Sequence, residues 1–212
     1  MKRLSILFFA VILAFTTLSA QEADIRKVAE KYKGVNTLTA AVTQTRHNEA
    51  VSGDMVAKGY FYYKHSLMSM VFSKEKEMLM TDGKTFVMIR DGKTRTAHGK
   101  GKGNNPFETL LRVFRNIFSG KACDDSLLGI ADVKLTEQAG VCTITVTPVI
   151  QNDKEKRRMM FSSFVAVVDL KSAELRSLCI HEKGKNYTRY DFSNYLPGVN
   201  ISDDVFDPQY AL

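Results

Sequence analysis

The side chains that most often carry out acid–base or metal chemistry are thinly spread along this sequence. The four histidines stand at positions 47, 65, 98 and 181, and no two of them have the short spacing of metal ligands. The serines at positions 66, 69 and 73 lack the Gly-x-Ser-x-Gly frame of an exposed nucleophile. The carboxylate pairs at 124–125 and 203–204 have the pattern of turns or helix caps. The sequence therefore predicts neither an enzyme nor a bound metal or cofactor.

Two Gly-Lys-Thr triplets, in Asp82-Gly83-Lys84-Thr85 and Asp91-Gly92-Lys93-Thr94, invite comparison with a phosphate-binding loop. Such a loop needs a further glycine before the triplet and a helix after it. Neither copy has that glycine, and each is followed by strand-like sequence. Because Asp-Gly between apolar runs is a strong hairpin signal, both copies are predicted to be turns.

The stretch from Gly59 to Arg90 has the pattern of four consecutive strands. Apolar residues recur two apart within each run, as in Met68, Met70 and Phe72, and this period places them on one face of a strand. Five of the nine methionines lie between positions 68 and 88, although Met is a weak strand former. The stretch is either an ordinary sheet core or a surface for a flexible apolar ligand, since unbranched thioethers repack easily.

The clearest helix is predicted from Asn105 to Gly120, after a basic, glycine-rich loop that begins at His98. Asn105 is a capping residue, Pro106 takes the first helical position and Gly120 ends the helix. The helix has one broad apolar stripe. Its members include Leu110, Leu111, Phe114, Ile117 and Phe118.

The remaining elements are predicted mainly to be strands. A helix is expected from Asp24 to Lys33, ended by Gly34. Alternating or β-branched runs predict strands at 38–45, 55–64, 132–136, 141–149, 159–170, 174–182 and 186–194. The last segment, 199–208, is expected to close a sheet edge. No Pro/Ser-rich linker divides the chain, so residues 21–212 are expected to form one domain.

The first twenty residues have the pattern of a secretory signal peptide. Lys2 and Arg3 precede an almost wholly apolar run, and Ala20 offers a small residue at the cleavage position. The apolar run is short for a membrane-spanning helix, so cleavage is preferred to a retained anchor. We therefore expect an exported protein, and no cysteine stands at the cleavage point to receive a lipid.

Charge and cysteine content bear on the partners and the disulfide bonds that the protein can have. Loss of Lys2 and Arg3 lowers the formal charge from +7 to +5, a mild excess without an aromatic-basic signature, so nucleic-acid binding is not expected. The three cysteines, Cys123, Cys142 and Cys179, are widely spaced. One disulfide with a buried thiol and three buried thiols both remain open, because the pairing cannot be deduced from sequence.

Several short motifs, taken in order, resemble the periplasmic outer-membrane lipoprotein carriers of the LolA family. Val42-Thr43-Gln44 is similar to the family's Phe-x-Gln, and Gly59-Tyr60-Phe61-Tyr62-Tyr63-Lys64 to its Gly-x-Leu-x-x-Lys. Asp82-Gly83-Lys84-Thr85 follows, and Gly103-Asn104-Asn105-Pro106-Phe107 is the best single match. The similarity covers nearly the whole chain from Gln21 to Leu212.

The resemblance implies an α+β fold: an incomplete, strongly curved antiparallel β-barrel, or half-barrel, with a helical lid over an apolar cavity. It further implies a monomeric periplasmic shuttle for acylated lipoproteins. An inner-membrane ABC transporter would load it, and an outer-membrane receptor would unload it. A carrier for another lipid or hydrophobic metabolite on the same fold is the alternative.

The expected ligand-binding residues follow from joining this resemblance to the apolar pattern. Which strand face points inward is left open, because both faces carry apolar residues. On the sheet the predicted residues are Phe61, Tyr63, Met68, Met70, Phe72, Met78, Met80, Phe86 and Met88, and on the lid Leu110, Leu111, Phe114, Ile117 and Phe118.

One position departs from the family pattern. Family members commonly carry Arg-Pro after the motif lysine, and the arginine latches the lid by hydrogen bonds, whereas this chain has His65-Ser66. His65 is the latch candidate in this sequence, with another group left open.

Overall fold

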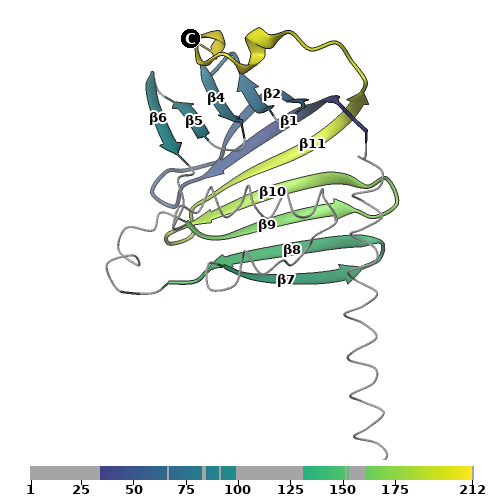
Figure 1. Cartoon of the computed structure of the whole chain (residues 1–212). Coiled ribbons are helices and arrows are strands. Elements are labelled where there is room, and N and C mark those ends of the chain that lie inside the picture. Colours follow the sequence, from purple (N-terminus) through teal and green to yellow (C-terminus); the bar gives the residue numbers. More distant parts are fainter. Residues whose placement is uncertain are drawn as a thin grey trace, which may run out of the picture.

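A computed structural model describes residues 34–65, 67–82, 85–90, 92–98, 131–150, 152 and 161–211. These residues form an antiparallel sheet of eleven strands (Figure 1). The strands are β1 Thr37–His47, β2 Met55–Lys64, β3 Leu67–Phe72, β4 Glu77–Thr81, β5 Thr85–Arg90, β6 Lys93–His98, β7 Ala131–Gln138, β8 Val141–Pro148, β9 Phe161–Asp169, β10 Glu174–Glu182 and β11 Tyr187–Pro197. The predicted helices at 24–33 and 105–120 lie outside the described residues.

The order of the strands is β6-β5-β4-β3-β2-β1-β11-β10-β9-β8-β7. Each half of the chain is a meander, and the two halves join where β1 pairs with β11. Most strands lie where the alternating pattern predicts them. The exception is β6, which begins within the predicted turn at 91–94 and for which no strand bounds were predicted, because its run Lys-Thr-Arg-Thr has no apolar alternation.

The expectation of an α+β half-barrel is wrong for the residues described. The sheet is open, with β6 and β7 at its two edges, and it is neither closed nor strongly curled (Figure 1). Outside the strands, the described chain contains only 3-10 turns and loops, with no α-helix and so none that could span a membrane. Alternation specifies pairing and faces, whereas closure depends on strand tilt and stagger, which a hydrophobic pattern does not encode.

One face of the sheet, called the continuous face here, carries the main hydrophobic cluster. Cross-strand partners share a face, so the register assigns Val42 of β1, Leu79 of β4 and Phe164 of β9 to it. The cluster runs along this face from partly buried Met88 on β5 to Val133 on β7. It joins the two halves of the chain across β1 and β11.

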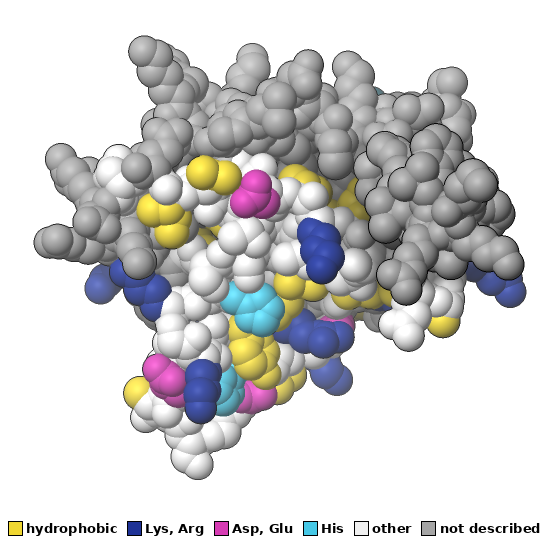
Figure 2. Space-filling model, turned by 90° about the horizontal axis from the view of Figure 1, so that it is seen from below, with side chains coloured by type: hydrophobic (Ala, Val, Ile, Leu, Met, Phe, Trp, Pro, Cys, Tyr) yellow, Lys and Arg dark blue, Asp and Glu magenta, His cyan; other side chains and the backbone are white. Residues whose placement is uncertain are grey.

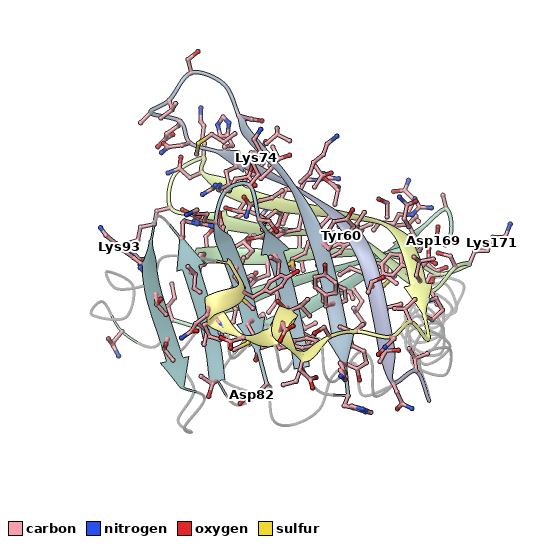
Figure 3. All side chains as sticks on the ribbon, turned by 90° about the horizontal axis from the view of Figure 1, so that it is seen from above. Tyr60, Lys74, Asp82, Lys93, Asp169 and Lys171 are labelled. Atoms are coloured by element: carbon pink, nitrogen blue, oxygen red, sulfur yellow. The ribbon has the colours of Figure 1, made fainter. Side chains whose placement is uncertain are left out.

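The opposite face is covered over part of its area by the C-terminal segment. Here η2 (Asp203–Phe206) contacts β3, and η3 (Pro208–Ala211) contacts β4 and β5. Figure 3 shows this segment crossing the strands on the Asp82 side, away from Lys74. Three residues of the segment are buried against this face of the sheet: Ile201, Val205 and Phe206. Residues 199–208 therefore pack on a sheet face, and the prediction that they close a sheet edge is wrong. We call this side the C-terminal face.

Lys64 fastens this segment to the sheet. Its Nζ atom donates to the Ile201 carbonyl at 3.0 Å and to Asp203 Oδ1 at 2.7 Å. Asp203 is largely exposed, so its ion pair is worth little, and the carbonyl contact contributes more of the stabilisation.

Gly59 allows two strands to approach closely at one point of the continuous face. A Cβ atom at this position would lie 2.2 Å from the Val71 carbonyl oxygen and 2.7 Å from Phe72 Cδ1. The Phe72 ring is completely buried there. Glycine is thus needed because the Phe72 ring and the β3 backbone occupy the space of its missing side chain.

Gly59→Ala is expected to lower the free energy of unfolding by about 2 kcal/mol, because backbone atoms cannot move aside cheaply. Urea unfolding measures the change, with the neighbouring exposed Lys58→Ala as the control. An unchanged midpoint for Gly59→Ala would contradict the close approach at β3.

Lys64→Met is expected to loosen the C-terminal segment at a cost on the order of 1 kcal/mol. Hydrogen exchange should quicken in residues 199–211 while the β1–β11 amides stay protected. Lys58→Met, which removes an exposed lysine from the same strand, is the matched control and should change neither region.

Candidate functional site

The register places seven of the nine predicted sheet residues on the continuous face, and six of these form one group. Phe61 stands opposite Met70, Met70 opposite Leu79, and Leu79 opposite Met88, so these residues form one row across β2 to β5. A neighbouring row on the same face consists of Tyr63, Met68, Thr81 and Phe86, each opposite the next. We call the six predicted residues the Met/Phe patch: Phe61, Tyr63, Met68, Met70, Phe86 and Met88.

All six members of the Met/Phe patch are only partly buried, like other apolar residues at the margin of the main cluster. Phe61 packs edge-on against Phe192 of β11, with ring centroids 5.9 Å apart. Leu79, in the centre of the row, is buried. The patch is therefore apolar and partly accessible, and its three methionines change rotamer easily. Figure 2 shows hydrophobic side chains adjoining basic and histidine side chains on one side of the molecule.

The other three predicted sheet residues do not belong to this patch. Phe72 shares its face but is fully buried above Gly59. Met78 and Met80 lie on the C-terminal face, Met78 buried and Met80 beside Ile201 and Phe206. The reason is the β3–β4 hairpin, which pairs Phe72 with Glu77, so even-numbered residues of β3 share a face with odd-numbered residues of β4. Alternation within each strand could not reveal this change.

The predicted lid residues, 110, 111, 114, 117 and 118, lie outside the described residues, as does Cys123. His65 is described: it is exposed, has a φ of 57°, donates its backbone N–H to the Asn36 carbonyl and accepts from the Tyr63 hydroxyl at 2.9 Å. Its contacts are those of a turn residue, and its role as a latch stays a prediction. Cys142 and Cys179 form no disulfide with each other, since they lie on opposite sheet faces.

A buried polar cluster lies beside the Met/Phe patch, and the sequence analysis missed it. We call it the Glu77 cluster: Gln44, Arg46, Glu77, Arg90 and Tyr190. Gln44 and Glu77 are 0% and 1% exposed. Arg90 donates to Glu77 Oε1 through Nη2 at 2.7 Å and Nε at 3.0 Å, and Arg46 Nη2 lies 3.1 Å from Glu77 Oε2.

The Gln44 amide and the Tyr190 phenol complete the cluster. Gln44 Nε2 donates to Glu77 Oε1 at 3.1 Å and to the Tyr190 hydroxyl at 3.5 Å. Burial disfavours the charge on Arg90, but the adjacent Glu77 carboxylate outweighs it and raises the Arg90 pKa. Two atoms, Gln44 Oε1 and Arg46 Nε, are buried without a hydrogen-bond partner. The cluster thus keeps one acceptor and one donor unused.

The cluster was detectable only in part from sequence. Gln44 and Glu77 occupy positions in strands where the alternation expects buried residues, and a buried carboxylate requires a partner. Their partners are distant in the chain, however, and 146 positions separate Gln44 from Tyr190. Among the residues described, no three His, Cys, Asp or Glu side chains are placed to hold a metal ion.

Comparisons with known proteins give similarity of structure at low sequence identity. No protein-family model matches the sequence, and no curated protein matches it significantly. A LolA superfamily protein from Nitrosomonas europaea is 7% identical, with a TM-score of 0.40 over 89% of this chain and 97% of that chain. The Mycobacterium tuberculosis lipoprotein LppX is 14% identical, with a TM-score of 0.40 over 87% and 99% of the two chains.

A DUF1329 family protein from Desulfovibrio piger is likewise similar, with 11% identity and a TM-score of 0.38 over 92% of this chain and 98% of that chain. The structure is thus similar to members of the LolA superfamily and to LppX in outline. At these identities and TM-scores the similarity does not assign this chain to the LolA family.

Tyr190 makes the fold sensitive to alkaline pH. Burial raises its pKa from 10.0 to about 12, so the folded state holds the phenol proton more tightly than the unfolded state. The free energy of unfolding should therefore fall above pH ~10, by up to about 1.4 kcal/mol per pH unit. Urea unfolding near pH ~9 and pH ~11 measures this loss. Tyr190→Phe should remove most of it, and an equal slope in both proteins would contradict the assignment.

Proposed function

We propose that this chain is an exported carrier that binds acyl chains on the Met/Phe patch and moves acylated lipoproteins from the inner to the outer membrane. The observation that supports the proposal is the row of partly buried Phe61, Met70 and Met88 side chains on one face of three strands. The patch offers apolar contact without a fixed shape, which suits a flexible chain better than a rigid ring.

The energetics of an acyl chain explain why a carrier needs such a surface. Each buried methylene is worth roughly 0.8 kcal/mol, so exposing about fifteen carbons to water costs on the order of 12 kcal/mol. A carrier must shield most of that area and still release the chain. Side chains that are already half-buried lose less free energy when the ligand leaves than fully exposed ones would, because they partly cover one another in the empty protein.

The proposed route begins with the signal peptide, which would send the chain to the periplasm. There it would receive cargo from an inner-membrane ABC transporter and pass it to an outer-membrane receptor, in line with the resemblance. Transfer requires that the receptor bind the acyl chain more favourably than this chain does, since equally tight binding in every state would trap the cargo.

Native mass spectrometry of the protein purified from its own periplasm tests the proposal as a whole. The expected spectrum contains a chain that begins at Gln21 with an acylated protein bound. Free lipid in place of acylated protein would exclude the lipoprotein route and favour another lipid as cargo. Repeated absence of any apolar ligand would overturn the proposal.

A pair of matched variants tests the patch itself. Met70→Gln places an amide of similar size on the continuous face, and the affinity for a fluorescent fatty acid should fall about tenfold, since roughly 1.4 kcal/mol of apolar contact is lost. Fluorescence titration measures the change.

Met80→Gln is the control, because Met80 is also partly buried but lies on the C-terminal face. It should leave the affinity unchanged, and thermal unfolding should confirm that both variants are folded. Equal loss of affinity in the two variants would argue against the continuous face as the binding surface.

A further inference from the structure

The Glu77 cluster adjoins the Met/Phe patch on the same face of the sheet. Arg90 lies two residues beyond Met88 on β5, and Glu77 lies two residues before Leu79 on β4. Two residues along a strand span roughly 7 Å. An apolar row and a charged row therefore lie side by side, at a spacing that one amphiphilic molecule can bridge.

The donors of the cluster are only partly used. Both contacts of Arg90 end on one oxygen of Glu77, and Arg46 makes a single ion pair with the other oxygen. Arg46 Nε is buried with no acceptor, and Gln44 Oε1 is buried with no donor. A buried guanidinium donor without an acceptor is costly. These two atoms on one strand lack the hydrogen-bond partners that a polar group of a ligand could supply at this place.

The charge near this place is positive. Two guanidinium groups contact the one carboxylate of Glu77. The negative charge of Glu182 also helps to raise the pKa of Arg90. Lys93 and Arg95 of β6 add two exposed cations. Lys93 stands opposite Arg90 and Arg95 opposite Met88, so both belong to the continuous face. Cations thus border the patch at its end and along its outer strand.

We propose that this place binds the anionic headgroup, a phosphate or a carboxylate, of an amphiphile whose acyl chain lies on the Met/Phe patch. The inference rests on the proposed function, because it takes acyl-chain binding by the patch as given. Arg46 donates through Nε to an anionic oxygen, Arg90 and Lys93 supply further positive charge, and Gln44 Oε1 accepts from a hydroxyl of the headgroup. The ligand class is an anionic lipid or an acidic group next to a protein-linked acyl chain.

A comparison of ligands with one acyl chain and different headgroups tests the inference. The probes are a lysophosphatidate, a fatty acid and a neutral monoacylglycerol of equal chain length, each titrated by calorimetry. The whole mature protein should bind the two anionic probes at least about tenfold more tightly than the neutral one, since a hydrogen bond to a charged group is worth roughly a factor of ten or more.

Arg46→Gln should abolish that preference and leave the affinity for the neutral probe unchanged, because the patch is untouched. Arg189→Gln removes the same charge from an exposed arginine on the C-terminal face and is the matched control. It should retain the preference for anionic probes. Arg46→Gln leaves Glu77 paired with Arg90 alone. Thermal unfolding of both variants verifies that they remain folded.

The outcomes separate the two proposals. Equal affinity for neutral and anionic probes would overturn the headgroup inference and leave acyl-chain binding standing, whereas failure to bind every probe would overturn both. Loss of the preference in Arg189→Gln as well would show a general charge effect and overturn the inference. Binding of inorganic phosphate alone, as tight as that of lysophosphatidate, would show an anion site without an acyl partner and would also overturn it.

Discussion

The pairing of β1 with strands from both halves of the chain is the constraint on which the rest of the structure depends. Its register with β2 on one side and β11 on the other places Val42, Gly59 and Phe192 on one face. Because side chains alternate with a period of two, a slip of one residue would exchange the two faces of a whole half-sheet. The register of β1 with β11 therefore determines which faces of the two half-sheets are continuous, and it places Gln44 opposite Tyr190.

The motif residues that carry the resemblance to lipoprotein carriers have structural tasks in this chain. Gln44 holds Glu77, Gly59 makes room for Phe72, and Lys64 fastens the C-terminal segment. None of the three lies in the Met/Phe patch. The same motif stretch also contains Phe61 and Tyr63 of the Met/Phe patch, so it combines residues that build and cover the sheet with residues of its apolar face.

The Met/Phe patch and the Glu77 cluster bring apolar and charged side chains next to each other on the continuous face. Two arginines and a glutamate lie beside the row of Phe61, Met70 and Met88, and buried charges of this kind are uncommon in an ordinary sheet core. Buried ion pairs add little net stability, because desolvation offsets most of the attraction. The proposed binding of an anionic headgroup would give these residues a role that stability alone does not.

Sequence alone determined the local structure. Period-two runs and Asp-Gly turns predicted most strands, and the apolar character of positions such as Met70 was visible in the pattern. Tertiary structure decided which face each strand presents, because the hairpin between Phe72 and Glu77 reverses the numbering parity and sends Met78 and Met80 to the other side. It also decided that the sheet stays open and that Gln44 meets Tyr190. These outcomes depend on register, twist and contacts between distant residues, for which a strand's own residues carry no signal.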